Sequence, residues 1–305
     1  MAISAGRSEE RVPRETTPVV NVLTVDVEEY YHAVEVGSAA GRGGVAGLPS
    51  RVVGQTERLL DVLEAHGARG TFFTLGVVAR RFPRLVRAIA DRGHELASHG
   101  WDHTPVFDLG PELFRRDVRR SKLAVEQAGG RAVHGYRAPV YSIRRDTPWA
   151  LTILAEEGYR YDSSIHPIAH DRYGRPDAPR FPHVALARRQ GRLWEVPVGT
   201  ARFAGTNLPV GGGFFRLFPL PLLRAAFASV NRADGHPLVF YVHPWELDPE
   251  QPRLAMPWPH RFRHYVGLGR AEARLRGLLA SFRFTSIASA FAEIRPPSLP
   301  VAAAS

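Results

Sequence analysis

The chain has 305 residues, 44% hydrophobic and 23% charged, a composition typical of a folded globular protein. It contains no cysteine, which excludes disulfides and thiolate metal sites, so any metal ion must be held by histidine and carboxylate ligands. The net charge of +10 comes almost entirely from arginine, in short pairs rather than long basic runs. We therefore expect solvated helix faces and no nucleic-acid partner.

The N-terminal residues 1–17 carry several charged side chains and lack an apolar core, so we expect a mobile leader that is not a signal peptide. No apolar run has the length of a transmembrane segment. Together these observations predict a cytoplasmic protein.

Residues 19–27 form the first predicted strand, rich in valine as in strands that are buried on both faces. After it, one pattern occurs four times: an amphipathic helix ends at a glycine, and a short apolar run follows. The predicted helices cover 52–65, 83–91, 111–127 and 148–157, and the strands after them cover 70–75, 94–98, 133–136 and 159–162. Two further strands are predicted at 193–198 and 237–242, and a last helix at 268–281 precedes a short strand at 282–286.

Alternating strands and helices predict a parallel sheet. About seven parallel strands favour an α/β fold of the deformed (β/α) barrel type, with an open doubly wound sheet as the alternative. No glycine fingerprint follows the first strand, so nucleotide binding has little support. Glycine- and proline-rich segments at 37–50, 205–213 and 248–265 are predicted loops.

We divide the chain into four parts on this basis. Residues 1–17 are the leader and residues 18–250 the barrel catalytic domain. Residues 251–296 are expected to be an extension packed on the barrel, and residues 297–305 a frayed tail.

His99 and His103 are the first candidates for a functional site. Two imidazoles four residues apart on one helical turn lie on the same face and can hold one metal ion. Because the chain has 13 histidines, the same spacing can also arise by chance. The neighbouring motifs decide between these interpretations.

Polar residues follow successive predicted strands at the same end, where the active sites of β/α barrels lie. In chain order they are Asp26 and Glu28, then His99 and His103, then Arg137, Asp162 and His243. This distribution predicts an enzyme. For Asp162, a local role in capping the next turn is an equal alternative.

The same segments resemble the motif series of the NodB-type polysaccharide deacetylases, carbohydrate esterase family 4. They read TVDVE at 24–28, SHGWDH at 98–103, RAPVY at 137–141, DSS at 162–164 and YVH at 241–243, and the resemblance covers about residues 19–245. Longer phrases at 26–32, 180–183 and 243–249 resemble the branch linked to exopolysaccharide gene clusters of the exosortase type, which has a C-terminal extension.

The resemblance implies a divalent metal ion, usually Zn²⁺, and hydrolysis of N-acetyl groups on a polysaccharide or oligosaccharide. By position, Asp26 matches the catalytic base, His243 the general acid and Arg137 the arginine that holds the base. His99 and His103 match two metal ligands. Val27 occupies the place where the familiar motif has the third ligand, which leaves Glu28 as the candidate for that role.

The residue types also suit this chemistry when the resemblance to the family is set aside. Two histidines and a carboxylate leave an open coordination position, a carboxylate can accept the proton of water, and an amine leaves only when it is protonated. Candidate substrate contacts are Tyr141, Trp101, Trp245 and Asp162, the rings because they can stack on sugar faces. The alternatives are a hydrolase of another linear or cyclic amide, and a carbohydrate-binding relative without catalysis.

A cytoplasmic enzyme of this kind would act on a glycan precursor or on a lipid-linked glycan at a membrane-bound assembly system. Its partner would then be an N-acetylated glycan, met before export.

Overall fold

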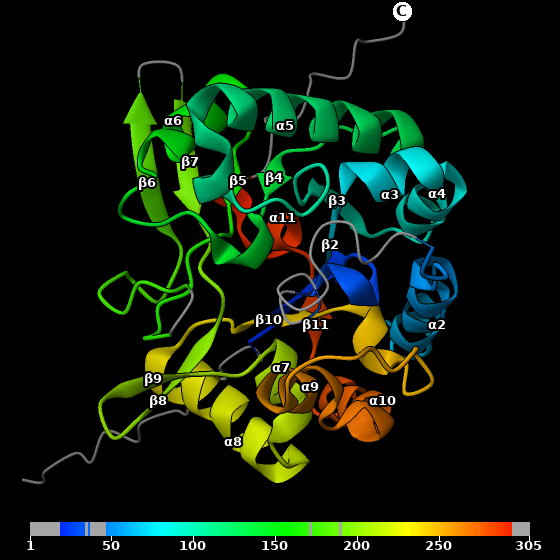
Figure 1. Ribbon diagram of the computed structural model, residues 1–305. Coiled ribbons are helices and arrows are strands. Elements are labelled where there is room, and N and C mark those ends of the chain that lie inside the picture. Colours follow the sequence, from blue (N-terminus) through cyan, green and yellow to red (C-terminus); the bar gives the residue numbers. More distant parts are fainter. Residues whose placement is uncertain (1–18, 34–35, 37–46, 171–172, 189–190, 295–305) are drawn as a thin grey trace, which may run out of the picture.

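A curled sheet of nine strands organises the chain in the computed structural model (Figure 1). The structure describes residues 19–33, 36, 47–170, 173–188 and 191–294, so the predicted leader and tail lie outside this part. The strands of this sheet are β1 (Asn21–Val27), β2 (Thr71–Thr74), β3 (Glu95–Ser98), β4 (Gly135–Tyr136), β5 (Tyr161–Asp162), β6 (His183–Arg188), β7 (Gly191–Glu195), β10 (Val239–Val242) and β11 (Phe284–Thr285).

The strand order is β10-β1-β2-β3-β4-β5-β7-β6, and β11 also pairs with β1. All neighbours are parallel except β6 and β7. From β1 to β7 the order follows the chain without the reversal that defines a doubly wound sheet. The deformed (β/α) barrel is therefore confirmed, with β10 and β6 at its two ends.

The first strand and the last long strand of the sheet are neighbours, with Thr24 of β1 opposite Tyr241 of β10. On the other side of β1 lies β2, with Asp26 opposite Phe73, and β3 follows with Phe73 opposite Ala97. This register brings the C-terminal ends of β1, β3 and β10 to the same end of the sheet. Residues from the two halves of the sequence meet there.

Helices cover the sheet on its outer side (Figure 1). The α-helices are α2 (Val52–Ala65), α3 (Gly76–Arg81), α4 (Pro83–Asp91), α5 (Val106–Gly129), α6 (Trp149–Glu156), α7 (Gly212–Leu217), α8 (Leu220–Ser229), α9 (Trp258–Tyr265), α10 (Leu268–Leu279) and α11 (Ile287–Ala290). Short 3₁₀ turns occur at η1 (Tyr30–His32), η2 (Pro139–Tyr141), η4 (Pro244–Leu247) and η5 (Ala292–Ile294), and a π-turn at η3 (Val230–Asp234).

The helix predicted at 111–127 begins earlier, because α5 continues N-terminally across a kink at Gly110. Gly110 has a φ of 68°, which a glycine adopts without a steric penalty, and Pro111 after it cannot donate a backbone hydrogen bond. The other three predicted helices agree with α2, α4 and α6 to within about one residue.

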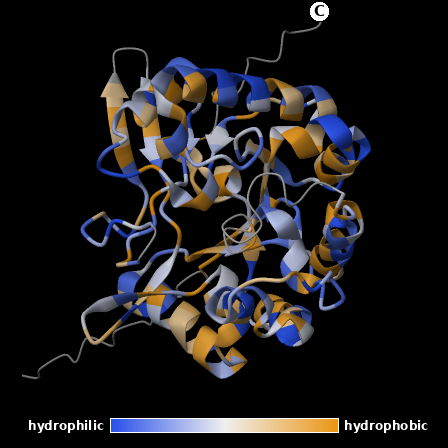
Figure 2. Cartoon of the chain, viewed as in Figure 1, coloured by the Kyte–Doolittle hydropathy of each residue, from blue (hydrophilic) through white to orange (hydrophobic). Residues whose placement is uncertain are grey.

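The core lies between the sheet and its helices. Leu23, Val25 and Val27 of β1 are fully buried and pack with apolar residues of the helices, among them Leu59 and Leu63 of α2. Figure 2 shows the matching pattern, with hydrophilic and hydrophobic stripes on the same helices. Burial of these apolar side chains is the main stabilising contribution to the barrel.

Two predicted loops are wrong. Residues 205–213 contribute to a two-stranded hairpin, β8 (Thr200–Phe203) with β9 (Thr206–Pro209), and to the start of α7. The segment 248–265 contains α9, whose Pro259 lies in the first turn, where a missing N–H costs no hydrogen bond. Glycine and proline stand at the ends of these elements, where they are as common as in irregular loops.

The described part of the predicted extension, residues 251–294, packs on the barrel through α10 and adds β11 to the sheet beside β1. The boundary at residue 250 stays a prediction. Among the described residues, no helix is both long and apolar enough to cross a membrane.

Candidate active site

A cavity of about 690 Å³ lies where β1, β3 and β10 end. Its wall includes the side chains that the sequence placed at the strand ends: Asp26, Glu28, His99, His103 and His243. Arg137 and Asp162 are fully buried behind this wall. The distribution of polar residues along the sequence thus corresponds to one place in the fold.

Glu28, His99 and His103 form a three-residue cluster whose ligand atoms all lie within 4.8 Å of one another. Nε2 of His103 is 2.8 Å and Nε2 of His99 is 3.9 Å from Oε2 of Glu28. The helical turn assumed for the histidine pair is wrong: His99 directly follows β3, and His103 lies in an irregular loop with a φ of 68°. The loop, rather than helical spacing, turns both imidazoles toward Glu28.

The direction of β1 explains why Glu28 faces the histidines. Side chains alternate along a strand, so Thr24, Asp26 and Glu28 share one face. Val27 points to the other face and packs in the apolar core with Val25. Residue 28, not residue 27, is therefore the position next to the two imidazoles.

Two hydrogen bonds orient the members of this cluster. The Nδ1 atom of His99 lies 2.8 Å from the carbonyl oxygen of Arg137, so it donates there and leaves Nε2 as the atom with a free electron pair. The indole Nε1 of Trp245 donates to Oε1 of Glu28 at 3.0 Å. Both partners are buried, so the cluster is built in one orientation.

Asp26 lies beside the cluster and is held by Arg137. Nη1 of Arg137 donates to Oδ1 of Asp26 at 2.8 Å and to Oγ1 of Thr24 at 2.9 Å, and the guanidinium also donates to the carbonyl and hydroxyl oxygens of Ser163. The second oxygen, Oδ2, is left facing His243, with 3.8 Å between Oδ2 and Nε2.

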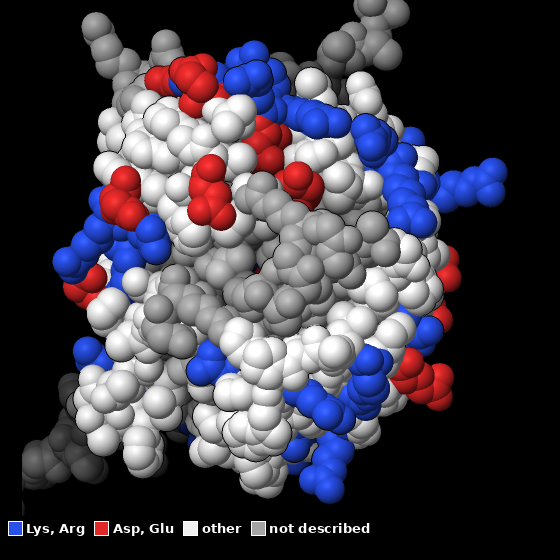
Figure 3. Space-filling view, viewed as in Figure 1, with Lys and Arg blue, Asp and Glu red and all other residues white. Residues whose placement is uncertain are grey.

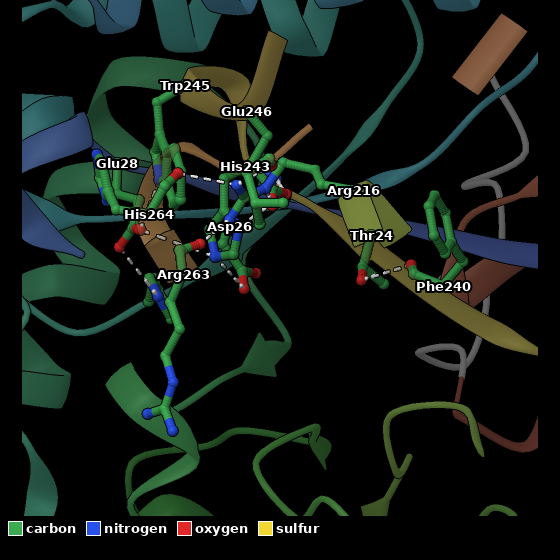
Figure 4. A network of polar contacts seen from close by, with 12 residues as sticks. Thr24, Asp26, Glu28, Arg216, Phe240, His243, Trp245, Glu246, Arg263 and His264 are labelled. Atoms are coloured by element: carbon green, nitrogen blue, oxygen red, sulfur yellow. Dashed lines mark hydrogen bonds and ion pairs between the residues drawn. The ribbon is translucent and has the colours of Figure 1, made fainter. Parts of the chain in front are cut away.

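His243 is held from behind by a buried ion pair that the sequence did not reveal (Figure 4). Both the backbone N–H and Nδ1 of His243 donate to Oε2 of Glu246, at 2.9 and 3.0 Å. The other oxygen of Glu246 accepts from Nε of Arg216 at 2.6 Å. His243 and Glu246 form a capping box at the start of the short helical turn η4. The spacing of three residues between them is the local sequence signal for Glu246.

The charges around the cavity set its protonation. Burial opposes protonation of His243, but Glu246, and beyond it Glu28 and Asp26, raise the pKa of His243 to about 9. Burial opposes ionisation of Glu28, but the imidazoles facing it, His103 first, bring the pKa of Glu28 well below its usual range. Burial lowers the pKa of His99 to about 4. At neutral pH the cavity thus presents a protonated His243, an ionised Glu28 and a neutral His99.

The four candidate substrate contacts lie in different places. Tyr141 and Trp245 line the cavity. Trp101 does not line it, although it lies between the two histidines in sequence: its ring lies in a separate groove, under the guanidinium of Arg120 at 3.4 Å. Asp162 is fully buried and accepts a hydrogen bond from the hydroxyl of Ser164, a contact that is compatible with the local role. Neither Trp101 nor Asp162 therefore lines this cavity.

Basic side chains are spread over the surface rather than gathered at the cavity. Figure 3 shows Lys and Arg along the rim of this face, with Asp and Glu near several of them. Ion pairs with exposed arginines, such as Arg119 with Glu157 and Arg58 with Glu272, account for part of this pattern. Such side chains are typical of solvated helix faces.

Two family models match the chain, one after the other. Residues 48–161 match the model described as polysaccharide deacetylase, and residues 163–292 match a domain of unknown function, DUF3473. The first contains His99, His103 and Arg137, and the second contains His243, Glu246 and Arg216. Asp26 and Glu28 precede both, so the cavity joins three parts of the sequence.

Curated relatives and a solved structure agree with this result. A peptidoglycan deacetylase-like protein of Gibberella zeae is 32% identical over 131 residues, which is 42% of this chain and 35% of the relative. A chitooligosaccharide deacetylase of Sinorhizobium fredii is 38% identical over 104 residues, 34% of this chain and 47% of the relative. The alignments thus span between a third and a half of the length of these relatives.

The crystal structure of a protein from Mycobacterium smegmatis, provisionally assigned as a polysaccharide deacetylase, has the same fold. It aligns with a TM-score of 0.54 and 22% identity over 89% of this chain and 91% of that one. This likeness concerns the fold, whereas the family model and the curated relatives agree with the motif series. Residues 48–161 of this chain are therefore a polysaccharide deacetylase domain, in agreement with the resemblance to the NodB-type deacetylases.

Proposed function

We propose that this protein removes N-acetyl groups from a polysaccharide or oligosaccharide by metal-dependent hydrolysis. The observation that carries the proposal is the arrangement in one cavity of a Glu28, His99 and His103 cluster with Asp26 and His243 beside it. A carboxylate that can accept a proton and an imidazolium that can donate one lie 3.8 Å apart, next to a site for a cation.

The cluster fits a divalent metal, and we propose Zn²⁺. Two imidazole nitrogens and one carboxylate oxygen are a common ligand set of catalytic zinc, and the hydrogen bonds from His99 to a carbonyl and from Trp245 to Glu28 are the outer contacts that such ligands use. When bound, the ion would polarise the acetamide carbonyl and make water more acidic.

The remaining steps belong to the side chains. Asp26, kept in place by Arg137, would take a proton from the attacking water as the new C–O bond forms. His243, protonated at neutral pH, would give its proton to the amide nitrogen as the C–N bond breaks. The products are acetate and the free amine of the sugar, and the proton taken by Asp26 restores His243 through solvent.

Glycan biosynthesis is the setting that we propose for this reaction. The phrases at 26–32 and 243–249 resemble the branch linked to exopolysaccharide gene clusters. A substrate in that setting is an N-acetylated precursor or lipid-linked glycan.

Acetate release from N-acetylglucosamine oligomers, measured together with the metal content of the purified protein, tests the proposal. Asp26→Asn and His243→Ala should each lower turnover by about 10²–10⁴-fold and leave the metal content unchanged. His134→Ala, a histidine outside the cavity wall, is the matched control. Hydrolysis of a cyclic amide or ureide without acetate release from any N-acetyl sugar would identify a different C–N hydrolase.

A further inference from the structure

Two exposed aromatic rings stand on the cavity wall outside all the family motifs. Trp258 and Phe262, one turn apart on α9, line the same cavity as Asp26 and His243. They are 73% and 46% exposed, and their rings stack with centroids 5.6 Å apart and planes at 19°. A single exposed ring is common on protein surfaces, but two adjacent exposed rings on the wall of a cavity are typical of a ligand-binding surface.

Helix α9, which carries these rings, is connected to His243, the proposed general acid, by buried hydrogen bonds. The guanidinium of Arg216, buried, donates to the carbonyl oxygens of Arg263, His264 and Val266 at the end of α9, at 2.7–3.0 Å. The same guanidinium pairs with Glu246, which holds His243 (Figure 4). One buried network therefore fixes both the acid and the helix.

A second contact joins α9 to the metal cluster. His264 is fully buried and stacks on Trp245 at 4.8 Å with an angle of 11°, and Trp245 donates to Glu28. The rings of Trp258 and Phe262 thus stand in a set position relative to the reacting groups. A preformed contact of this kind costs little conformational entropy when a ligand binds.

The cavity wall carries Asp26, Glu28 and the three histidines at its catalytic end, whereas at α9 the two rings are accompanied by Pro259 and by the charged Arg263. A ligand that fills both ends needs a polar part to react and flat C–H faces to stack, which a chain of pyranose rings offers. On this basis, and resting on the proposed function, we propose that Trp258 and Phe262 form a sugar-stacking subsite. The enzyme would then bind a glycan beyond the sugar that loses its acetyl group.

The test compares a short substrate with a long one. We would measure kcat/KM for acetate release from N-acetylglucosamine and from its pentamer, in wild type, Trp258→Ala and Phe262→Ala. Loss of one stacking contact should lower kcat/KM for the pentamer by about tenfold, mainly through KM, and leave the monomer unaffected. Phe203→Ala removes an equally exposed ring, 71% exposed and outside the cavity wall, and should change neither.

Other outcomes would overturn the subsite. Equal losses on monomer and pentamer would mean that Trp258 only supports the fold, and no loss on the pentamer would mean that it touches no substrate. Binding of the wild type to phosphatidylcholine–phosphatidylglycerol vesicles that Trp258→Ala abolishes, with unchanged pentamer kinetics, would assign the rings to a membrane surface instead. Wild type that releases acetate from neither sugar would overturn the proposed function, and the subsite with it.

Discussion

The hydrogen bond from Trp245 to Glu28 provides the sharpest test of the metal cluster. Trp245→Phe removes the N–H donor but keeps a ring that can stack between His243 and His264, now at 5.1 and 4.8 Å. A hydrogen bond to a charged acceptor contributes about 1.5–3 kcal/mol, which corresponds to about 10- to 100-fold in affinity. Loss of a partner that orients a metal ligand has effects of the same size.

We therefore expect Trp245→Phe to bind Zn²⁺ about 10- to 100-fold more weakly than wild type. Competition with a chromophoric chelator measures the dissociation constant, and circular dichroism checks that the fold persists. Trp149→Phe is the matched control, because Trp149 packs edge-to-face on Phe114 at 5.5 Å, away from the cavity wall. The reasoning would be refuted by equal Zn²⁺ affinities in Trp245→Phe and wild type.

Three further predictions follow from neighbouring contacts. Glu28→Ala should remove most of the bound metal, measured by elemental analysis, whereas Val27→Ala, on the opposite face of β1, should keep it. Glu246→Gln should lower turnover on the order of 10²-fold at unchanged metal content, because a neutral amide no longer supports a protonated imidazole; full activity would assign Glu246 to the fold alone. Burial raises the pKa of Asp117 from 3.8 to about 7. The folded state therefore loses stability as the pH rises from 3.8 to about 7, and the whole loss is present above pH 7. Asp117→Asn should therefore raise the free energy of unfolding by about 2 kcal/mol above pH 7, a value that allows for the partial exposure of Asp117. Below pH 3.8 the substitution should leave the free energy of unfolding unchanged. Urea titrations above pH 7 and below pH 3.8 measure this difference.

The regular part of the barrel could be predicted because its signals are local. Glycines that end helices and short valine- and phenylalanine-rich runs lie within a few residues of the elements that they mark, as at Gly93 before β3. The hairpin of β8 and β9 was missed because Gly205 in its turn also fits an irregular loop, and the strands themselves are stabilised by their partners across the sheet, as is the antiparallel strand β6. The kinked start of α5 was missed because Gly110 and Pro111, read locally, end a helix rather than continue one.

The site separates in the same way into residues that carry the chemistry and residues that hold them. The first group stands at strand ends and could be found from the sequence, even though the helical turn assumed for His103 was wrong. Of the second group, Arg137 was named from the motif series, but Arg216 and Glu246 were not, because they are 30 residues apart and both are remote in sequence from Glu28.

The surroundings of Val27 cannot be deduced from the linear motif and become clear only in the folded strand. In the linear motif, valine at that place casts doubt on the third ligand. In the strand, residue 27 packs into the apolar core and residue 28 faces the histidines, with its second oxygen held by Trp245. A carboxylate at 27 would be buried in the core without a charge partner, at a cost of several kcal/mol, unless the strand turned. The alternation of β1 thus places Glu28 beside the two imidazoles, as the proposed third ligand must be, and it places Val27 in the apolar core.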